Sequence, residues 1–120
     1  GATMPADFAH FTAEGGRTAI LREILRQRPD LGDASDSRGF KPIHLAALAG
    51  HAQVISALLE EGADLTATDR HGFTSLHFAT KGGHRQVVEH LIQHRADLIA
   101  QAKDGTTPSA VAEKLGQSHL

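Results

Sequence analysis

Histidines are the residues best able to do chemistry in this chain, because its 120 residues include nine histidines and no cysteine. His90 and His94 stand four residues apart, which places both imidazoles on one face of a helix, within reach of one metal ion. His84 is nearby in the sequence, but there is no HExxH arrangement and no clear third ligand. We therefore predict surface histidines and no metal site, and keep metal-dependent chemistry as an alternative.

The sequence contains none of the motifs that mark other common kinds of catalytic site. It contains no phosphate-binding loop, no dinucleotide-binding glycine motif and no G-x-S-x-G nucleophile turn. Carboxylates are plentiful, but they fall on expected turns and outer helix faces instead of converging from several elements. We expect a protein that is not an enzyme and that binds no cofactor.

The composition indicates a single folded domain. Hydrophobic residues make up 40% of the chain, and the formal net charge of −2 gives no overall field to attract nucleic acid or an anionic membrane. No apolar run approaches the roughly 18 residues that span a bilayer, and the N-terminus lacks a signal-peptide pattern. We expect an intracellular, cytoplasmic domain at residues 4–120, with no nucleic-acid or membrane partner. Residues 1–3, before the only methionine, are interpreted as a cloning remnant.

The chain repeats itself with a period of 33 residues. Residues 36–68 and 69–101 align with fourteen identities, where unrelated sequences of this composition would share roughly two. Apolar residues in each segment fall at helical spacing, so each is expected to form a turn, a short helix, a tight turn and a longer helix. No alternation typical of strands competes with this interpretation.

Residues at the helix ends match between the two repeats, with two exceptions. Pro42 suits the first turn of a helix, and Gly62 supplies a left-handed exit from the following one. Ser75 and Arg95 stand at these positions in the next repeat. Arg95 is expected to cost about 1 kcal/mol if the backbone is still left-handed there.

The repeat continues imperfectly in both directions. Upstream, residues 5–35 form a first unit with a helix pair at residues 6–28, and downstream residues 102–120 match only the first half of a unit. A missing second helix would leave Val111 and Leu115 less well covered than the equivalent interior residues. Either more chain follows, or something else covers this edge.

The segments DSRGFKPIHLAALAGHAQVISALLEEGADLTAT and DRHGFTSLHFATKGGHRQVVEHLIQHRADLIAQ resemble the ankyrin repeat in their period and in the place of their histidine. The resemblance extends from about residue 6 to residue 116. It implies an all-α fold, an ankyrin-repeat solenoid of stacked helix-turn-helix units joined by β-hairpin-like turns. In that family the histidine, here His10, His44 and His77, hydrogen-bonds within and between neighbouring turns. The resemblance also implies a non-enzymatic adaptor or inhibitor that binds a protein.

The resemblance further implies that a concave face, formed by the turn tips and the inner sides of the first helices, contacts the partner. The residues at the corresponding variable positions here are Arg38, Phe40, Leu48, Arg70, His71, Phe73, Lys81 and Lys103. Phe40 and Phe73 are expected at equivalent tip positions, where a solvent-facing ring would leave about 1.5 to 3 kcal/mol of burial unused and where aromatic side chains make good interface anchors. The alternative is that they pack on the adjacent turn and join the repeats.

The charge of these positions indicates the kind of partner. They are net basic, so we expect a protein partner with an acidic or mixed acidic and apolar segment. RNA or DNA could use the same charge, but the few aromatic residues and the acidic total disfavour it. The rival function is structural, with weak self-association through the open C-terminal edge, or a chain that is a fragment of a larger ankyrin-repeat protein.

Overall fold

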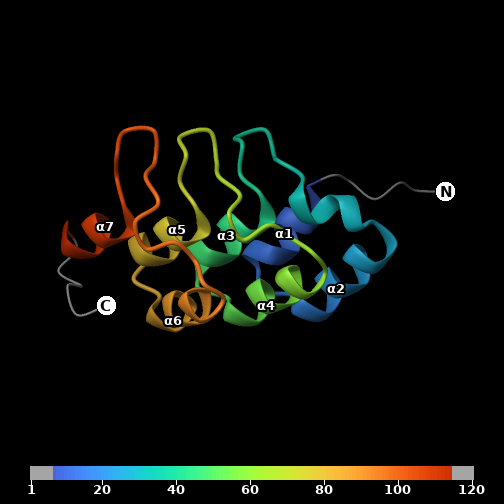
Figure 1. The fold of residues 1–120 in the computed structure, drawn as a ribbon. Coiled ribbons are helices and arrows are strands. Elements are labelled where there is room, and N and C mark those ends of the chain that lie inside the picture. The colour runs from blue at the N-terminus through green and yellow to red at the C-terminus, as the bar shows by residue number, and fades with distance from the viewer. Residues whose placement is uncertain (1–6, 115–120) are drawn as a thin grey trace.

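The polypeptide alternates short helices with projecting turns (Figure 1). The computed structural model describes residues 7–114, so residues 1–3, Leu115 and the last residues of the expected half-unit lie outside it. The helices are α1 (Phe8–Glu14), α2 (Thr18–Gln27), the 3-10 helix η1 (Pro29–Asp33), α3 (Pro42–Ala49), α4 (Ala52–Glu60), α5 (Ser75–Lys81), α6 (Arg85–Gln93) and α7 (Pro108–Lys114). No β-strand occurs within residues 7–114, which confirms the predicted all-α class.

The helices form two rows. An inner row contains α1, α3, α5 and α7, an outer row contains α2, α4 and α6, and neighbours within each row pack against each other (Figure 1). Three long turns project from the inner row in the same direction (Figure 1). No helix between residues 7 and 114 is both long and apolar enough to cross a membrane.

A continuous apolar core runs between the two rows. It is built from the same positions in each unit: Leu21, Ile55 and Val88 of the outer helices are 0%, 0% and 3% exposed. Ile43 and Leu76 occupy matching buried positions in α3 and α5. Each such side chain contributes about 1.5 to 3 kcal/mol by leaving water, so the repeated apolar pattern stabilises the stack.

Local structure accommodates Ser75 and Arg95, the two exceptions to the repeat pattern at helix ends. At the start of α5, Thr74 caps the helix by accepting a hydrogen bond from the His77 amide, while the Thr74 amide donates to Nδ1 of His77 at 3.0 Å. At the helix exits, Gly62 has φ +93° and Arg95 has φ +67°. Arg95 is therefore left-handed, which is the condition under which a cost of about 1 kcal/mol is expected, and it occupies a backbone region that favours glycine.

Four histidines connect neighbouring units through main-chain carbonyls. In each case Nε2 of the ring donates to a carbonyl oxygen of the adjacent unit, and the pairs are His10 with Phe40 (2.8 Å), His77 with Thr106 (2.9 Å), His51 with Glu14 (3.0 Å) and His84 with Leu48 (2.7 Å). His10 and His77 are two of the three histidines for which the resemblance implied such a role. His51 and His84 stand just before the outer helices α4 and α6, and their bonds across units are an additional finding.

His44, the third histidine named for the resemblance, is hydrogen-bonded at both ring nitrogens. Nδ1 accepts the Lys41 amide hydrogen at 3.0 Å, and Nε2 donates to the Ala67 carbonyl at 3.0 Å. This pattern requires the neutral ring, and burial lowers the pKa of His44 from its ordinary value near 6.5. The side chain therefore acts as a structural crosslink.

The two ends of the stack expose apolar side chains. Phe11 in α1 is 71% exposed, whereas the equivalent residues Leu45 and Phe78 are 4% and 8% exposed. After α6, Leu98 and Ile99 are 45% and 74% exposed, and the equivalent residues of the preceding unit are the half-buried Leu65 and the exposed Thr66. A neighbouring unit covers the position of Phe11 in the interior, so the N-terminal edge retains the character of an inter-unit contact.

Candidate functional site

The projecting turns are hydrogen-bonded hairpins, which we number 1 (residues 36–40), 2 (residues 69–73) and 3 (residues 102–106). In hairpin 1 the Asp36 amide donates to the Phe40 carbonyl at 2.8 Å, and Oδ1 of Asp36 accepts the amides of Arg38 and Phe40. Partial burial opposes ionisation of Asp36, but the bonds from the Arg38 side chain and the two amides lower its pKa overall. Asp69 accepts the equivalent amide bonds in hairpin 2. The hairpins are therefore preorganised.

The hairpins are also joined to one another. Nη2 of Arg70 donates to the Ser37 carbonyl at 2.7 Å, and the stem of the arginine lies over Gly39, where a Cβ atom would meet its Cγ at 2.5 Å. The Lys103 amide donates to the His71 carbonyl at 2.9 Å. These contacts make the three hairpins one continuous surface instead of three independent loops.

Phe40 and Phe73 turn toward the helices. The ring of Phe78 in α5 lies 5.6 Å from that of Phe40 and 6.1 Å from that of Phe73, both in edge-to-face geometry. Both hairpin phenylalanines are half-buried and pack on the core, as in the alternative that they join the repeats. Phe78, which stands where the preceding unit has the smaller Leu45, contacts both rings.

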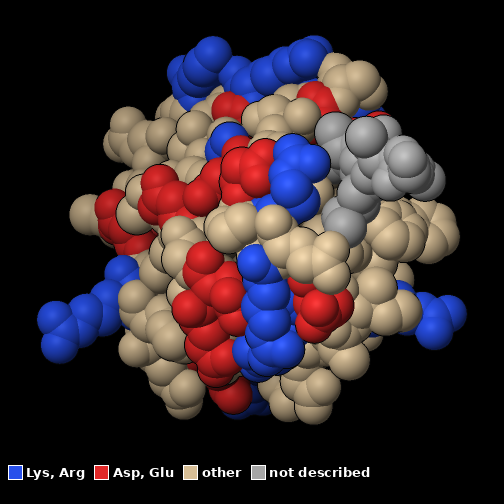
Figure 2. All heavy atoms as spheres, turned by 90° about the vertical axis from the view of Figure 1, so that its right-hand side faces the viewer, with Lys and Arg blue, Asp and Glu red and all other residues tan. Residues whose placement is uncertain are grey.

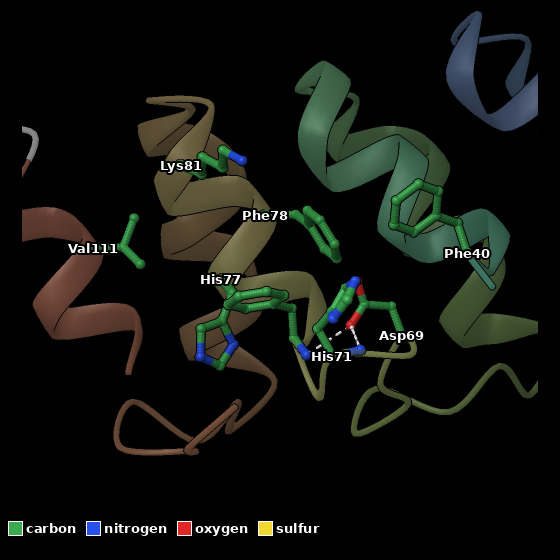
Figure 3. Close-up of a pocket in the computed structure, with 8 residues that line it drawn as sticks. Phe40, Asp69, His71, His77, Phe78, Lys81 and Val111 are labelled. Carbon is green, nitrogen blue, oxygen red and sulfur yellow. Dashed lines mark hydrogen bonds between the residues drawn. The ribbon is translucent and has the colours of Figure 1, made fainter. Parts of the chain in front are cut away.

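An apolar pocket of about 190 Å³ opens beside these rings (Figure 3). Its lining comes from hairpin 2, from α5 and from α7, with Phe40 on the α3 side, and comprises Phe40, Asp69, His71, Phe73, His77, Phe78, Lys81 and Val111. We call it the α5 pocket. Lys81 and Asp69 lie on opposite sides of it (Figure 3).

The α5 pocket brings together four of the eight residues that the sequence suggested for partner binding: Phe40, His71, Phe73 and Lys81. Arg38 lies next to them, with its guanidinium carbon 5.0 Å from the centre of the Phe40 ring and Nη2 2.8 Å from Asp36. Five of the eight predicted residues therefore lie together, in or beside the α5 pocket.

The remaining candidates lie outside the α5 pocket. Arg70 holds hairpin 1, and Lys103 is exposed on hairpin 3. Leu48 is 40% exposed near the end of α3, where its carbonyl accepts the bond from His84. These three could widen a contact surface around the pocket without lining it.

Four lining residues were missed by sequence reasoning or assigned only structural roles: Asp69, His77, Phe78 and Val111. Their structural roles are real, since both ring nitrogens of His77 and one oxygen of Asp69 are hydrogen-bonded. The signal that could have found the pocket is the exchange of Leu45 for Phe78 between otherwise similar repeats.

The histidines considered for metal binding have separate roles. Nε2 of His84 donates to the Leu48 carbonyl, and Nε2 of His90 lies 2.7 Å from Oγ of Ser56. His94 stacks near His90 with ring centres 4.9 Å apart. In the described part of the chain, no three histidine or carboxylate side chains form a cluster that could hold a metal ion.

Charge is distributed differently over the N-terminal end and the hairpins. Figure 2 shows acidic and basic side chains interleaved on the lower part of the N-terminal end, while basic side chains gather at the top, over the hairpins. Three ion pairs at this end join Arg22 of α2 with Glu60 of α4, Arg26 with Glu23 within α2, and Arg28 with Asp30 of η1. The arginines of the first unit therefore belong to a solvated, largely neutralised face.

A stack of helix pairs with joined hairpins defines a repeat-protein scaffold. A family model described as ankyrin repeats, in three copies, matches residues 9–118, and the chain belongs to the ankyrin repeat family. Ankyrin repeats are generally protein–protein interaction modules, and the family is generally non-enzymatic.

The chain is also similar to a potassium channel, AKT3 of Oryza sativa subsp. japonica. The two are 38% identical over 62 residues, which is 52% of this chain and 7% of the channel. The chain thus spans a small part of that relative.

Proposed function

We propose that this domain is an adaptor or inhibitor that binds an acidic or mixed acidic and apolar segment of a protein partner, without catalysing a reaction. The observation that carries the proposal is the α5 pocket, an apolar depression beside Lys81 and below the basic hairpins. An intracellular, cytoplasmic setting is part of the proposal, and fractionation of the source cell checks it.

Rigidity supports this proposal. The Asp36 and Asp69 carboxylates fix hairpins 1 and 2, and bonds from Arg70 and Lys103 join the hairpins. Little backbone entropy would be lost on binding, so more of the contact energy becomes affinity.

Electrostatics supports an acidic partner. Lys81, Arg70 and Lys103 are exposed and make no ion pair with residues 7–111, whose side chains the structure describes, whereas Asp36 is engaged by Arg38. Asp104 is the exposed carboxylate on the same surface, beside Lys103. The remaining positive charge would speed the approach of an acidic segment and fix its register.

Affinity capture from the source cell's lysate tests the proposal. The bait is compared with a Lys81→Glu, Lys103→Glu variant, which reverses exposed charges and leaves the Phe78 contacts intact. A matched control, Arg17→Glu with Arg26→Glu, reverses two charges on the N-terminal end. We expect a protein retained by the unmodified domain and the control but lost from the first variant. Equal recovery by all three would reject the hairpin and α5 surface.

A second function, self-association, is favoured by the exposed Leu98 and Ile99 at the C-terminal edge. It predicts dimers that grow with concentration in sedimentation velocity and disappear in Leu98→Glu. A monomer at every concentration would reject it.

A further inference from the structure

We infer that the α5 pocket holds one aromatic or large aliphatic side chain of the partner, and that a carboxylate within two residues of this anchor binds Lys81. This inference rests on the proposed function and names the recognition chemistry of the same site. It assigns the apolar and the ionic parts of the contact to different walls of the α5 pocket.

The size of the pocket limits the anchor to one ring. Its volume is about 190 Å³, and an apolar protein cavity of about 150 Å³ holds one benzene molecule. Phe73, Phe78 and Val111 contribute apolar wall from hairpin 2, α5 and α7 (Figure 3). A phenylalanine or leucine side chain would therefore fill it, and a second ring would not fit.

The polar groups around the pocket define an orientation. Oδ1 of Asp69 already accepts the amides of His71 and Phe73, and the ring of His77 is bonded at both nitrogens. Lys81 is exposed and makes no hydrogen bond or ion pair with residues 7–111, whose side chains the structure describes. A ligand carboxylate is therefore attracted to the Lys81 side and repelled from the Asp69 side, which lie opposite each other (Figure 3).

The surroundings favour a polypeptide over a small molecule. Basic side chains continue beyond the pocket onto the hairpins, where Arg70 and Lys103 are exposed. A ligand the size of one ring would not reach them, whereas an acidic segment lying along the hairpins would meet them in turn. Each contact adds little when exposed to solvent, so the anchor supplies affinity and the charges supply orientation.

Three short peptides test the assignment: acetyl-Glu-Phe-Glu-amide, acetyl-Gln-Phe-Gln-amide and acetyl-Glu-Ala-Glu-amide. Each is titrated into the isotopically labelled chain at low salt, and NMR follows the Val111 methyl groups and the Phe78 and His77 ring signals. We expect millimolar binding of the first, as ligands of this size allow. The second should bind about two- to five-fold more weakly, and the third should not shift the pocket signals.

Variants separate the anchor from the charge. Lys81→Gln should make the Glu and Gln peptides bind equally while both still shift the Val111 signals. Lys103→Gln, a matched loss of charge outside the pocket, should keep most of the difference. If neither phenylalanine peptide shifts the pocket signals, the anchor is refuted; if both bind the unmodified chain equally, the role of Lys81 is refuted.

These results are distinguishable from a failure of the proposed function. A partner captured in a Lys81- and Lys103-dependent manner, with no peptide binding in the α5 pocket, would keep the function and reject the anchor. Peptide binding as described supports the anchor even if the captured protein is indifferent to the charge reversals, in which case the broader surface is rejected.

Discussion

The second and third units, residues 36–68 and 69–101, build the same helix pair by different local means. Pro42 opens α3, whereas a Thr74 cap opens α5. Gly62 and Arg95 occupy the same left-handed exit. The comparison teaches that residues at helix ends can be exchanged at a cost of about 1 kcal/mol each, while the apolar positions carry the fold.

The same two units also differ at a residue of the candidate site. Leu45 and Phe78 occupy equivalent positions, and the larger ring of Phe78 contacts both hairpin phenylalanines and lines the α5 pocket. A change of size at one repeated position thus contributes to the candidate site of the third unit.

The largest expected effect is a loss of stability that depends on where a buried leucine lies in the stack. Leu58 and Leu91 are equivalent and fully buried, but α4 packs between α2 and α6, whereas α6 has an outer-row neighbour on one side within residues 7–114. Leu58→Ala should cost about 3 to 5 kcal/mol and Leu91→Ala about 2 to 3 kcal/mol, because the open end can collapse around the smaller side chain. Urea unfolding followed by circular dichroism measures both. Equal losses would contradict the difference.

The next effect concerns the ring in α5. Phe78→Leu makes the third unit resemble the second and should cost about 1 to 1.5 kcal/mol through the lost edge-to-face contacts. Phe11→Leu is the matched control at the equivalent, 71% exposed position and should change stability by less than about 0.5 kcal/mol. Thermal and urea unfolding check both, and similar losses would show that the aromatic contacts contribute little.

The exit from the outer helix gives a stabilising prediction. Arg95→Gly should raise the free energy of unfolding by about 1 kcal/mol, since glycine adopts φ +67° without strain. The reciprocal Gly62→Arg should lose a similar amount from the backbone alone, because no atom lies within 4 Å of a Cβ placed there. Urea midpoints for the two variants should move in opposite directions, and a shift in the same direction would contradict this account.

The start of α5 gives a smaller gain. Thr74 is extended, with φ −93° and ψ 172°, as the residue before a proline prefers, and Oγ of Ser75 is buried without a hydrogen-bond partner. Ser75→Pro should stabilise the domain by about 0.4 to 1 kcal/mol by restricting the unfolded chain. A lower melting temperature would show that the Ser75 amide or hydroxyl has a role in the fold.

The smallest expected effect is on how steeply the free energy of unfolding depends on pH. The pKa of His44 is lowered in the folded protein by burial, so unfolding releases a ring that takes up a proton more readily. The contribution of His44 is fully present above about pH 6.5 and is lost as the pH falls through its folded value. His44→Gln should flatten the dependence of unfolding free energy on pH below 6.5. An unchanged slope would mean that the acid sensitivity comes from other histidines.

The sequence predicted the repeating parts of the fold because they obey local rules. The 33-residue period and the helix pairs follow from propensity and spacing, and the alignment identifies Arg95 as the residue at the helix exit where the preceding unit has Gly62. Each of these features repeats or breaks a repeated position, so comparison within one chain reveals it.

The candidate site was less predictable because it depends on contacts between units. The sequence left open whether Phe40 and Phe73 anchor a partner or join the repeats, and the ring that both of them contact, Phe78, belongs to α5. It gave no sign that Arg70 would be held by Ser37 or that His84 would reach Leu48. Such bonds end on main-chain carbonyls, and every residue type has one.

Hydrogen bonds that end on main-chain carbonyls place few limits on how the sequence can evolve. The histidine bonds between units end on the carbonyls of residues such as Phe40 and Leu48, whose side chains face the proposed partner surface or its border. Substituting those side chains removes no acceptor, so the joints between units survive mutation of the surface they support. Partner preference can therefore evolve, or be varied in a library, at positions that also hold the stack together.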